Sequence, residues 1–317
     1  MGRVPARATF RAGIDAMISK SESVGAESPS TGRSAADFMS LTKPRIILMV
    51  VFTVAAAFYL ASGGRMDYLL LFHSLAGIVM ATGGSLALNQ AAEEDIDFMM
   101  NRTRLRPLPD QRLHHYEALA FGISLLAAGN LYLIFFVNPL TAFLTALTGM
   151  MYLLLYTPLK RISSWNTIVG AIPGAMPPVL GWSAAMNSVP VAGWILFSIL
   201  FVWQIPHALA IGVLYRDEFR AAGVRLLPVE DPDGRKTGFH VVNYCIALIP
   251  IGMMPTLTGM AGPVYFFLSL FLAFVYLGYG IQLARKCTVE AARHLFFVSL
   301  IYLPVSILVM VLDHGQF

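Results

Sequence analysis

Long apolar runs separated by short polar segments make up most of the chain after residue 45. A helix of about 17–25 apolar residues crosses the hydrocarbon core of a bilayer, which is roughly 30 Å thick. Runs of this kind lie at 46–63, 68–91, 116–136, 140–158, 166–186, 190–215, 240–260, 262–283 and 295–312. They lack the alternation of barrel strands, so each predicts a transmembrane helix that satisfies its own backbone. The predicted fold class is therefore an all-α, polytopic membrane bundle of nine helices.

Basic residues fall almost entirely on one side of these predicted spans. Of the 22 Lys and Arg residues, only Arg65 lies in a loop on the opposite side. Because Lys and Arg stay on the cytoplasmic side, we expect a cytoplasmic N-terminus and an external C-terminus. Insertion topology alone explains most single basic residues. The acids, however, gather in the same large loops, 92–115 and 216–239, and none is expected inside a span, which a topology rule does not require.

The composition excludes a water-soluble globular domain. Of the 317 residues 57% are hydrophobic and 13% charged, and the mean hydropathy is +0.67, whereas soluble domains are about 25% charged. The first forty residues are rich in Ser, Arg and Gly and contain no apolar run. We therefore expect a disordered cytoplasmic extension at 1–40 and a nine-helix domain at 41–317, placed in the cell inner membrane. The alternative for this basic start is an organellar presequence, with an organellar inner membrane as location.

One polar stretch directly follows the second apolar run. Asn89, Glu93 and Asp97 recur every four residues, and each such step turns a helix about 40° beyond a full circle. Their oxygens are therefore expected on one helix face, with Glu94 pointing away. Mg²⁺ prefers oxygen ligands and is held by one or two carboxylates together with substrate phosphates. Three arginines follow in NRTRLRPLP, and guanidinium groups pair with phosphate oxygens.

The acids and arginines of this stretch together favour a magnesium diphosphate site. The alternative is a solvated helix end with internal ion pairs. A second polar segment supports the diphosphate interpretation, because it leaves the sixth run on the same membrane face. It extends from His207 inside the run to Asp217 and Glu218 beyond it. Two such segments can close on one cation and diphosphate.

The segment NQAAEEDIDFMMNRTRLRPLP resembles the first aspartate-rich motif of the UbiA-type intramembrane prenyltransferases. Further segments resemble in particular their protohaem IX farnesyltransferase (haem O synthase) branch: LTKPRI, KRISSWNTIVGAIPGAMPPVLGW, WQIPHALAI and DEFRAAGVRLLPV. The resemblance extends from residue 41 to about residue 244, and the family fold also has nine spans. The chain departs from the branch at Arg225, where the branch has proline, and in the acidic EDPDGRK that follows. Both departures lie in the loop expected to cover the site.

The resemblance implies a role for each matching residue. Asn89, Glu93 and Asp97 take the Mg²⁺ and catalytic positions. Glu218 is a further catalytic residue, and the implied substrate contacts are Arg102, Arg106, Lys43, Lys160, Arg161 and Asp217. His207 matches the histidine of the branch and is expected inside a span, where ionisable groups usually face the bundle interior. A neutral imidazole there can bind haem iron or act as a base, and simple packing with a hydrogen bond is the alternative.

The implied activity is the Mg²⁺-dependent transfer of farnesyl from farnesyl diphosphate to a vinyl group of haem B, which gives haem O. The implied partners are farnesyl diphosphate, haem B, the lipid bilayer and membrane proteins that handle haem, with no nucleic acid. Two alternatives remain open. One is a UbiA-type enzyme that prenylates an aromatic quinone precursor. The other is an ion-coupled transporter with ionisable groups at mid-membrane; prolines in spans five and six fit its broken helices, but we expect no carboxylate in any span.

Overall fold

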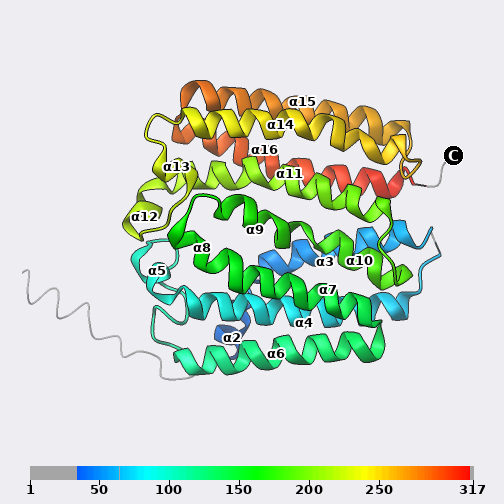
Figure 1. Cartoon of the computed structure of the whole chain (residues 1–317), viewed down its shortest axis with the longest axis horizontal. Helices are drawn as coiled ribbons and strands as arrows, with labels where there is room; N and C mark the ends of the chain where they lie inside the picture. Colours follow the sequence, from blue (N-terminus) through cyan, green and yellow to red (C-terminus); the bar gives the residue numbers. More distant parts are fainter. Residues whose placement is uncertain (1–33, 64, 315–317) are drawn as a thin grey trace, which may run out of the picture. The chain divides into compact units, whose positions relative to one another are not determined.

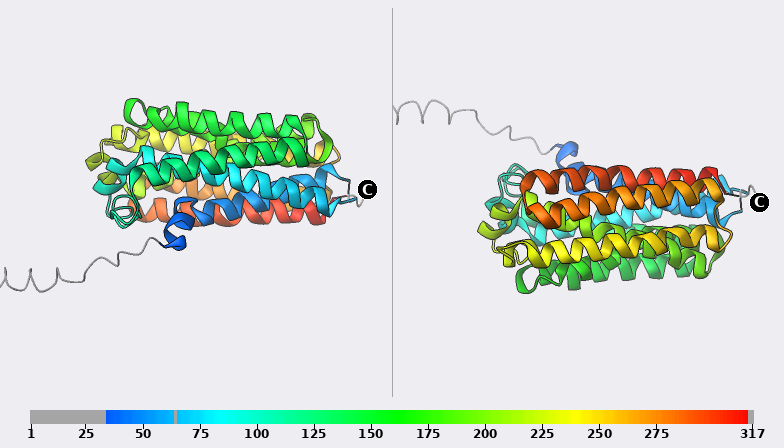
Figure 2. Two further views of the ribbon diagram at one scale, coloured as in Figure 1. Left: turned by 90° about the horizontal axis from the view of Figure 1, so that it is seen from below. Right: turned by 90° about the horizontal axis from the view of Figure 1, so that it is seen from above.

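The computed structural model describes residues 34–63 and 65–314. Within these ranges, nine helical segments are long and apolar enough to cross a membrane, as the apolar pattern predicts. Seven are single helices, of which the first six are α3 (Pro44–Ala61), α4 (Tyr68–Ala92), α6 (His115–Phe136), α11 (Val191–Leu214), α14 (Arg235–Leu257) and α15 (Pro263–Lys286). α16 (Val289–Leu312) is the last. All run along one direction in perpendicular views (Figures 1 and 2).

Two spans are composite. The fourth, Pro139–Ile162, consists of α7 (Pro139–Met150), the π-helix η1 (Met151–Tyr156) and α8 (Thr157–Ile162). The fifth, Asn166–Met186, consists of α9 (Asn166–Ala175) and α10 (Pro177–Met186), which meet at Met176. Pro177 has no N–H to donate, so the backbone ladder is interrupted at this junction.

Short helices gather at one end of the bundle, at the left of Figure 1. They are α5 (Glu94–Met99), α12 (Arg216–Ala221) and α13 (Leu227–Glu230), beside α8 at the end of span four. We call this the charged end, because it holds the loops in which the acids and bases concentrate. Ile96 and Met100, from α5 and its end, pack with Ala222 and Val224 of the loop after α12. The two polar segments found in the sequence therefore do lie against each other.

The expected boundary at residue 40 is wrong, because Ala35–Leu41 forms helix α2. The Phe38 ring contacts Phe121 of α6 at 5.2 Å between centroids, and the Gln90 amide donates to the carbonyl of Leu41 at 2.9 Å. Asp37 is buried and paired with Arg112. These contacts offset the entropy of ordering the segment, which its polar composition alone does not reveal. The remainder of the expected disordered extension, residues 1–33, lies outside the described residues.

Two carboxylates lie within transmembrane helices, contrary to the sequence expectation. Glu117 occupies the first turn of α6, where its side chain accepts from the backbone N–H of His114 at 2.9 Å, and Glu290 lies in the first turn of α16. Acids are favourable in a first turn because they interact with the free N–H groups of the helix. Both lie at the charged end, far from mid-membrane, so neither supports a transporter.

Close packing of α4 on α6 depends on glycine. A Cβ placed on Gly129 would lie 2.5 Å from the backbone nitrogen of Ala81, and one on Gly84 would lie 2.5 Å from that of Leu126. Small residues allow membrane helices to approach until their backbones touch. This approach fixes α4, which carries the first polar segment.

We expect Gly129→Ala to destabilise the bundle by about 1–3 kcal/mol, because the added methyl group must push one backbone away from another. Gly278→Ala is the matched control, since a Cβ at that position of α15 meets nothing within 4 Å. This control should be neutral or slightly stabilising, because alanine favours the helix. Thermal unfolding of the two detergent-solubilised variants measures the difference. Equal unfolding temperatures would contradict the packing argument.

Candidate active site

The predicted row of oxygen side chains survives a break between two helices. α4 ends at Ala92 and α5 begins at Glu94, with Glu93 in a non-helical conformation between them. The N–H of Glu93 nevertheless donates to the carbonyl of Asn89 at 3.1 Å, and that of Asp97 to the carbonyl of Glu93 at 2.8 Å. The helical pattern of backbone hydrogen bonds therefore continues through Glu93, and side chains four residues apart still lie on one face. All three side chains are buried, whereas the side chain of Glu94 is 39% exposed.

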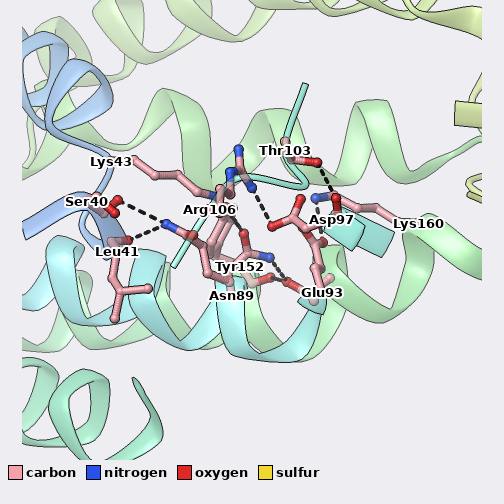
Figure 3. A network of polar contacts seen from close by, with 12 residues as sticks. Ser40, Leu41, Lys43, Asn89, Glu93, Asp97, Thr103, Arg106, Tyr152 and Lys160 are labelled. Carbon is pink, nitrogen blue, oxygen red and sulfur yellow. Dashed lines mark hydrogen bonds and ion pairs between the residues drawn. The ribbon is translucent and has the colours of Figure 1, made fainter. Parts of the chain in front are cut away.

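A basic side chain approaches each member of the row (Figure 3). Lys43 Nζ lies 2.9 Å from Asn89 Oδ1, and Lys160 Nζ lies 2.6 Å from Glu93 Oε1. Arg106 Nη1 lies 2.6 Å from Asp97 Oδ2. We call these six residues the polar cluster. Its three bases come from the residue before α3, from the loop after α5 and from α8, so the fold assembles them from distant segments.

Lys43 is held in an unusual position. Its backbone is left-handed, with φ 52° and ψ 69°, directly before Pro44 at the start of α3. Such a conformation is uncommon for a residue with a side chain and persists where surrounding contacts fix it. Burial, followed by the charges of Arg106 and Lys160, lowers the pKa of Lys43 to about 7. An anion bound beside Lys43 would therefore favour its charged form.

Tyrosines of η1 complete the polar cluster, and the sequence reasoning missed them. Tyr152 donates its hydroxyl to Asn89 Oδ1 at 3.0 Å, while Asn89 Nδ2 donates to Thr157 Oγ1 at 3.1 Å. Lys160 Nζ lies 4.5 Å from the centre of the Tyr156 ring, a cation–π contact. Short π-helices often occur at functional sites. The available signal was the Tyr-x3-Tyr-x3-Lys spacing in MYLLLYTPLK.

Arg102 and Glu218 join the two charged loops beside the cluster. The guanidinium of Arg102 lies 4.9 Å from the ring centre of Tyr215 and 5.8 Å from that of Phe219. Glu218 Oε2 accepts from the backbone N–H of Arg102 at 3.4 Å. The structure thus brings two of the predicted site residues together, but at the contact between the loops and outside the polar cluster.

Two other predicted residues point away from the cluster. Arg161 Nη2 pairs with Asp95 Oδ1 at 2.5 Å, and this hydrogen bond lowers the pKa of Asp95. The Asp217 side chain is 91% exposed and pairs with Arg220 at 3.1 Å. Asn101, which would extend the row in a longer helix, is exposed because α5 ends at Met99. Of the predicted anion contacts, Lys43, Lys160 and Arg106 therefore belong to the cluster.

A largely apolar cavity of about 480 Å³ lies next to the polar cluster, with Tyr152 and Tyr156 in its wall. Gly170 and Gly174 of α9 line it as well. A Cβ on Gly170 would lie 2.4 Å from the Tyr156 ring. Other lining residues come from α3, α4, α7, α10, α11 and α16. An amphipathic molecule can therefore place a polar head at the cluster and an apolar body among the helices.

His207 of α11 lies in the wall of this cavity. Its Nδ1 is 2.6 Å from Ser299 Oγ, and its ring stacks on Trp203 and Phe296 at centroid distances of 5.1 and 5.2 Å. The expectation that it faces the interior of the bundle agrees with this placement. Gln204, which the sequence reasoning missed, lines the same wall and donates to the carbonyl of Ala171 at 2.7 Å.

Comparison with protein families assigns the chain to one of them. The model of the UbiA prenyltransferase family matches residues 50–301. The chain belongs to the UbiA prenyltransferase family. As a member, it is a multi-pass membrane enzyme that transfers prenyl groups. Its relatives include the protoheme IX farnesyltransferase of Solibacter usitatus, 41% identical over 87% of this chain and 98% of the relative. A second relative of the same name, from Koribacter versatilis, is 36% identical over 94% of this chain and 99% of the relative.

Solved structures share the UbiA fold. A digeranylgeranylglyceryl phosphate synthase superposes with a TM-score of 0.75 at 15% identity, covering 88% of this UbiA prenyltransferase and 97% of that chain. A UbiA homolog from Archaeoglobus fulgidus, bound to GPP and Mg²⁺, superposes with a TM-score of 0.56 at 14% identity, covering 87% of this chain and 99% of that chain. At these identities the matches establish the fold.

Proposed function

We propose that the chain is a protohaem IX farnesyltransferase that makes haem O. In this reaction the allylic C–O bond of farnesyl diphosphate breaks, and the farnesyl carbon bonds to a vinyl carbon of haem B. Water adds its hydroxyl to the other vinyl carbon, and diphosphate and a proton are released. The observation that carries the proposal is a cluster of acids and bases beside an apolar cavity, in a chain whose curated relatives bear this name.

Asn89, Glu93 and Asp97 fit a role in holding Mg²⁺. They offer one amide and two carboxylate oxygens, the hard donors that Mg²⁺ prefers. Within residues 34–63 and 65–314, no set of three His, Cys, Asp or Glu side chains is arranged to hold a metal. Substrate phosphates would therefore supply the remaining ligands, as is usual for Mg²⁺. When bound, the ion would neutralise charge on the diphosphate and make it a better leaving group.

Lys43, Lys160 and Arg106 are the proposed diphosphate contacts. In the structure Lys160 and Arg106 neutralise Glu93 and Asp97, and Lys43 donates a hydrogen bond to Asn89. A metal ion that takes those oxygens frees the three bases for the phosphates. Their fixed positions would stabilise charge on the departing diphosphate without reorganisation. For Arg102 and Glu218 we propose a contribution through the joined loops, and for Arg161 and Asp217 a weaker one at the exposed rim.

The apolar cavity is the proposed place of the farnesyl chain and the porphyrin. His207 lies in its wall, so we propose it as the contact with haem iron or as the base that meets the incoming water. We further propose the cell inner membrane as location, with the charged end in the cytoplasm, because that end collects the basic residues. Membrane proteins that handle haem would then deliver the acceptor and collect the product.

Turnover with two competing acceptors tests the proposal. Purified protein is incubated with labelled farnesyl diphosphate, Mg²⁺, haem B and an aromatic acceptor, 4-hydroxybenzoate. We expect label only in a more apolar haem, whose mass exceeds that of haem B by one farnesyl group and one hydroxyl group. Label in the aromatic compound alone would favour the quinone-precursor alternative and contradict the proposal.

Replacing Arg106 by Lys should weaken farnesyl diphosphate binding by about 1–3 kcal/mol, because charge remains but the planar fork is lost. Arg104→Lys is the matched control, since Arg104 is exposed in the same loop. Binding of farnesyl diphosphate and of haem is measured separately for each variant. Equal effects of the two substitutions, or an effect of Arg106→Lys on haem alone, would remove Arg106 from the diphosphate site.

A further inference from the structure

Ser299 of α16 makes two contacts with the cavity wall formed by α11. Its backbone carbonyl accepts from Trp203 Nε1 at 3.0 Å, and its Oγ lies 2.6 Å from His207 Nδ1. Ser299 is fully buried, and the rings of Trp203 and Phe296 both stack against the imidazole ring of His207. The ring of His207 is therefore held in position by Ser299, 92 positions away along the chain, and in its plane by the two stacked rings.

The proton positions in this contact follow from a second short distance. Ser299 Oγ lies 2.5 Å from the carbonyl oxygen of Phe296. Two oxygens approach so closely only with a hydrogen between them, and a carbonyl has none to give. The serine hydrogen therefore points to Phe296. The bond to His207 must then run from Nδ1–H to the serine oxygen, because Oγ has no second hydrogen.

We infer that Ser299 fixes His207 as the Nδ1–H tautomer and thereby presents Nε2 to the cavity as an unprotonated nitrogen. In a neutral imidazole one nitrogen donates and the other carries a lone pair. Among the residues that the structure describes, none is hydrogen-bonded to Nε2. The lone pair is free to accept a proton or to bind a metal such as haem iron. Ser299 is a positioning residue that acts through His207.

Nitrogen NMR of ¹⁵N-histidine protein in detergent tests the tautomer without substrates. His207→Gln identifies the His207 signals by their loss. We expect wild-type protein to show Nδ1 protonated and Nε2 unprotonated, Ser299→Ala to show a mixture of tautomers, and Ser299→Thr, which keeps a hydroxyl, to resemble wild type. A protonated Nε2 in wild type, or a Ser299→Ala spectrum unchanged from wild type, would overturn the inference. The wild-type spectrum decides even where a variant fails to fold.

Haem titration tests the consequence, and this step alone rests on the proposed function. We expect Ser299→Ala to bind haem roughly 3- to 10-fold more weakly, which converts to about 0.6–1.4 kcal/mol, the net contribution of one hydrogen bond. Ser306→Ala is the matched control, because Ser306 is buried on the same helix and makes no hydrogen bond to His207 within the described chain.

The two measurements separate the inference from the proposed function. Equal haem affinity of Ser299→Ala and Ser306→Ala would show that Nε2 does not serve the acceptor, and would overturn that part of the inference. Protein that shows the Nδ1–H tautomer but binds no haem would contradict the haem proposal and leave the role of Ser299 in setting the tautomer intact.

Discussion

Asp97→Asn is expected to lower turnover by at least roughly 10²–10³-fold, the loss that follows removal of one strong stabiliser of transition-state charge. The substitution keeps the shape of the side chain but removes the charge that would hold Mg²⁺ and that now pairs with Arg106 at 2.6 Å. Haem binding should stay unchanged, because we propose that the acceptor binds beside His207, away from the polar cluster. Steady-state rates and haem titrations on the same preparations measure both effects.

Glu94→Gln is the control for Asp97→Asn, because Glu94 lies on the same short helix but is only half-buried and pairs with His115 at 3.0 Å. It should retain most of the activity. Full turnover by Asp97→Asn, or equal losses in the two variants, would show that the buried row does not hold the leaving group.

His207→Ala is expected to weaken haem binding at least roughly tenfold, which corresponds to about 1.4 kcal/mol, and to change the visible spectrum of bound haem. Farnesyl diphosphate binding should be unaffected, because His207 has no contact with the polar cluster among the described residues. His294→Ala, an exposed histidine of α16, is the control. If His207→Ala weakens farnesyl diphosphate binding alone, the proposed positions of the two substrates in the cavity are the wrong way round.

The nine spans and the oxygen row could be predicted from the sequence because both depend on local periodicity. Apolar runs of bilayer length leave no alternative to helices, and a spacing of four keeps side chains on one face as long as backbone hydrogen bonds continue. They do continue through Glu93, although that residue is not helical. Helix α2 was missed because its order depends on contacts with α6 and Arg112, which no local pattern records.

The partners of each charge could not be predicted, because they depend on which segments the fold brings together. Lys43 reaches Asn89 across 46 positions and Lys160 reaches Glu93 across 67. Arg102 resembled a phosphate contact, yet the rings of Tyr215 and Phe219 lie beside it and attract its guanidinium. Tyr152 was hidden in an apolar run, where η1 alters the helical register that a sequence reading assumes.

A crystal structure with Mn²⁺ and an unreactive thio analogue of farnesyl diphosphate tests the central claim most directly. Mn²⁺ takes the oxygen ligands that Mg²⁺ takes, and its anomalous signal locates the ion. The account predicts an ion bound by oxygens of Asn89, Glu93 or Asp97, with the diphosphate against Arg106, Lys43 and Lys160 and the farnesyl chain in the apolar cavity. An ion and diphosphate bound elsewhere, with both ion pairs of the cluster and the hydrogen bond from Lys43 to Asn89 intact, would contradict it.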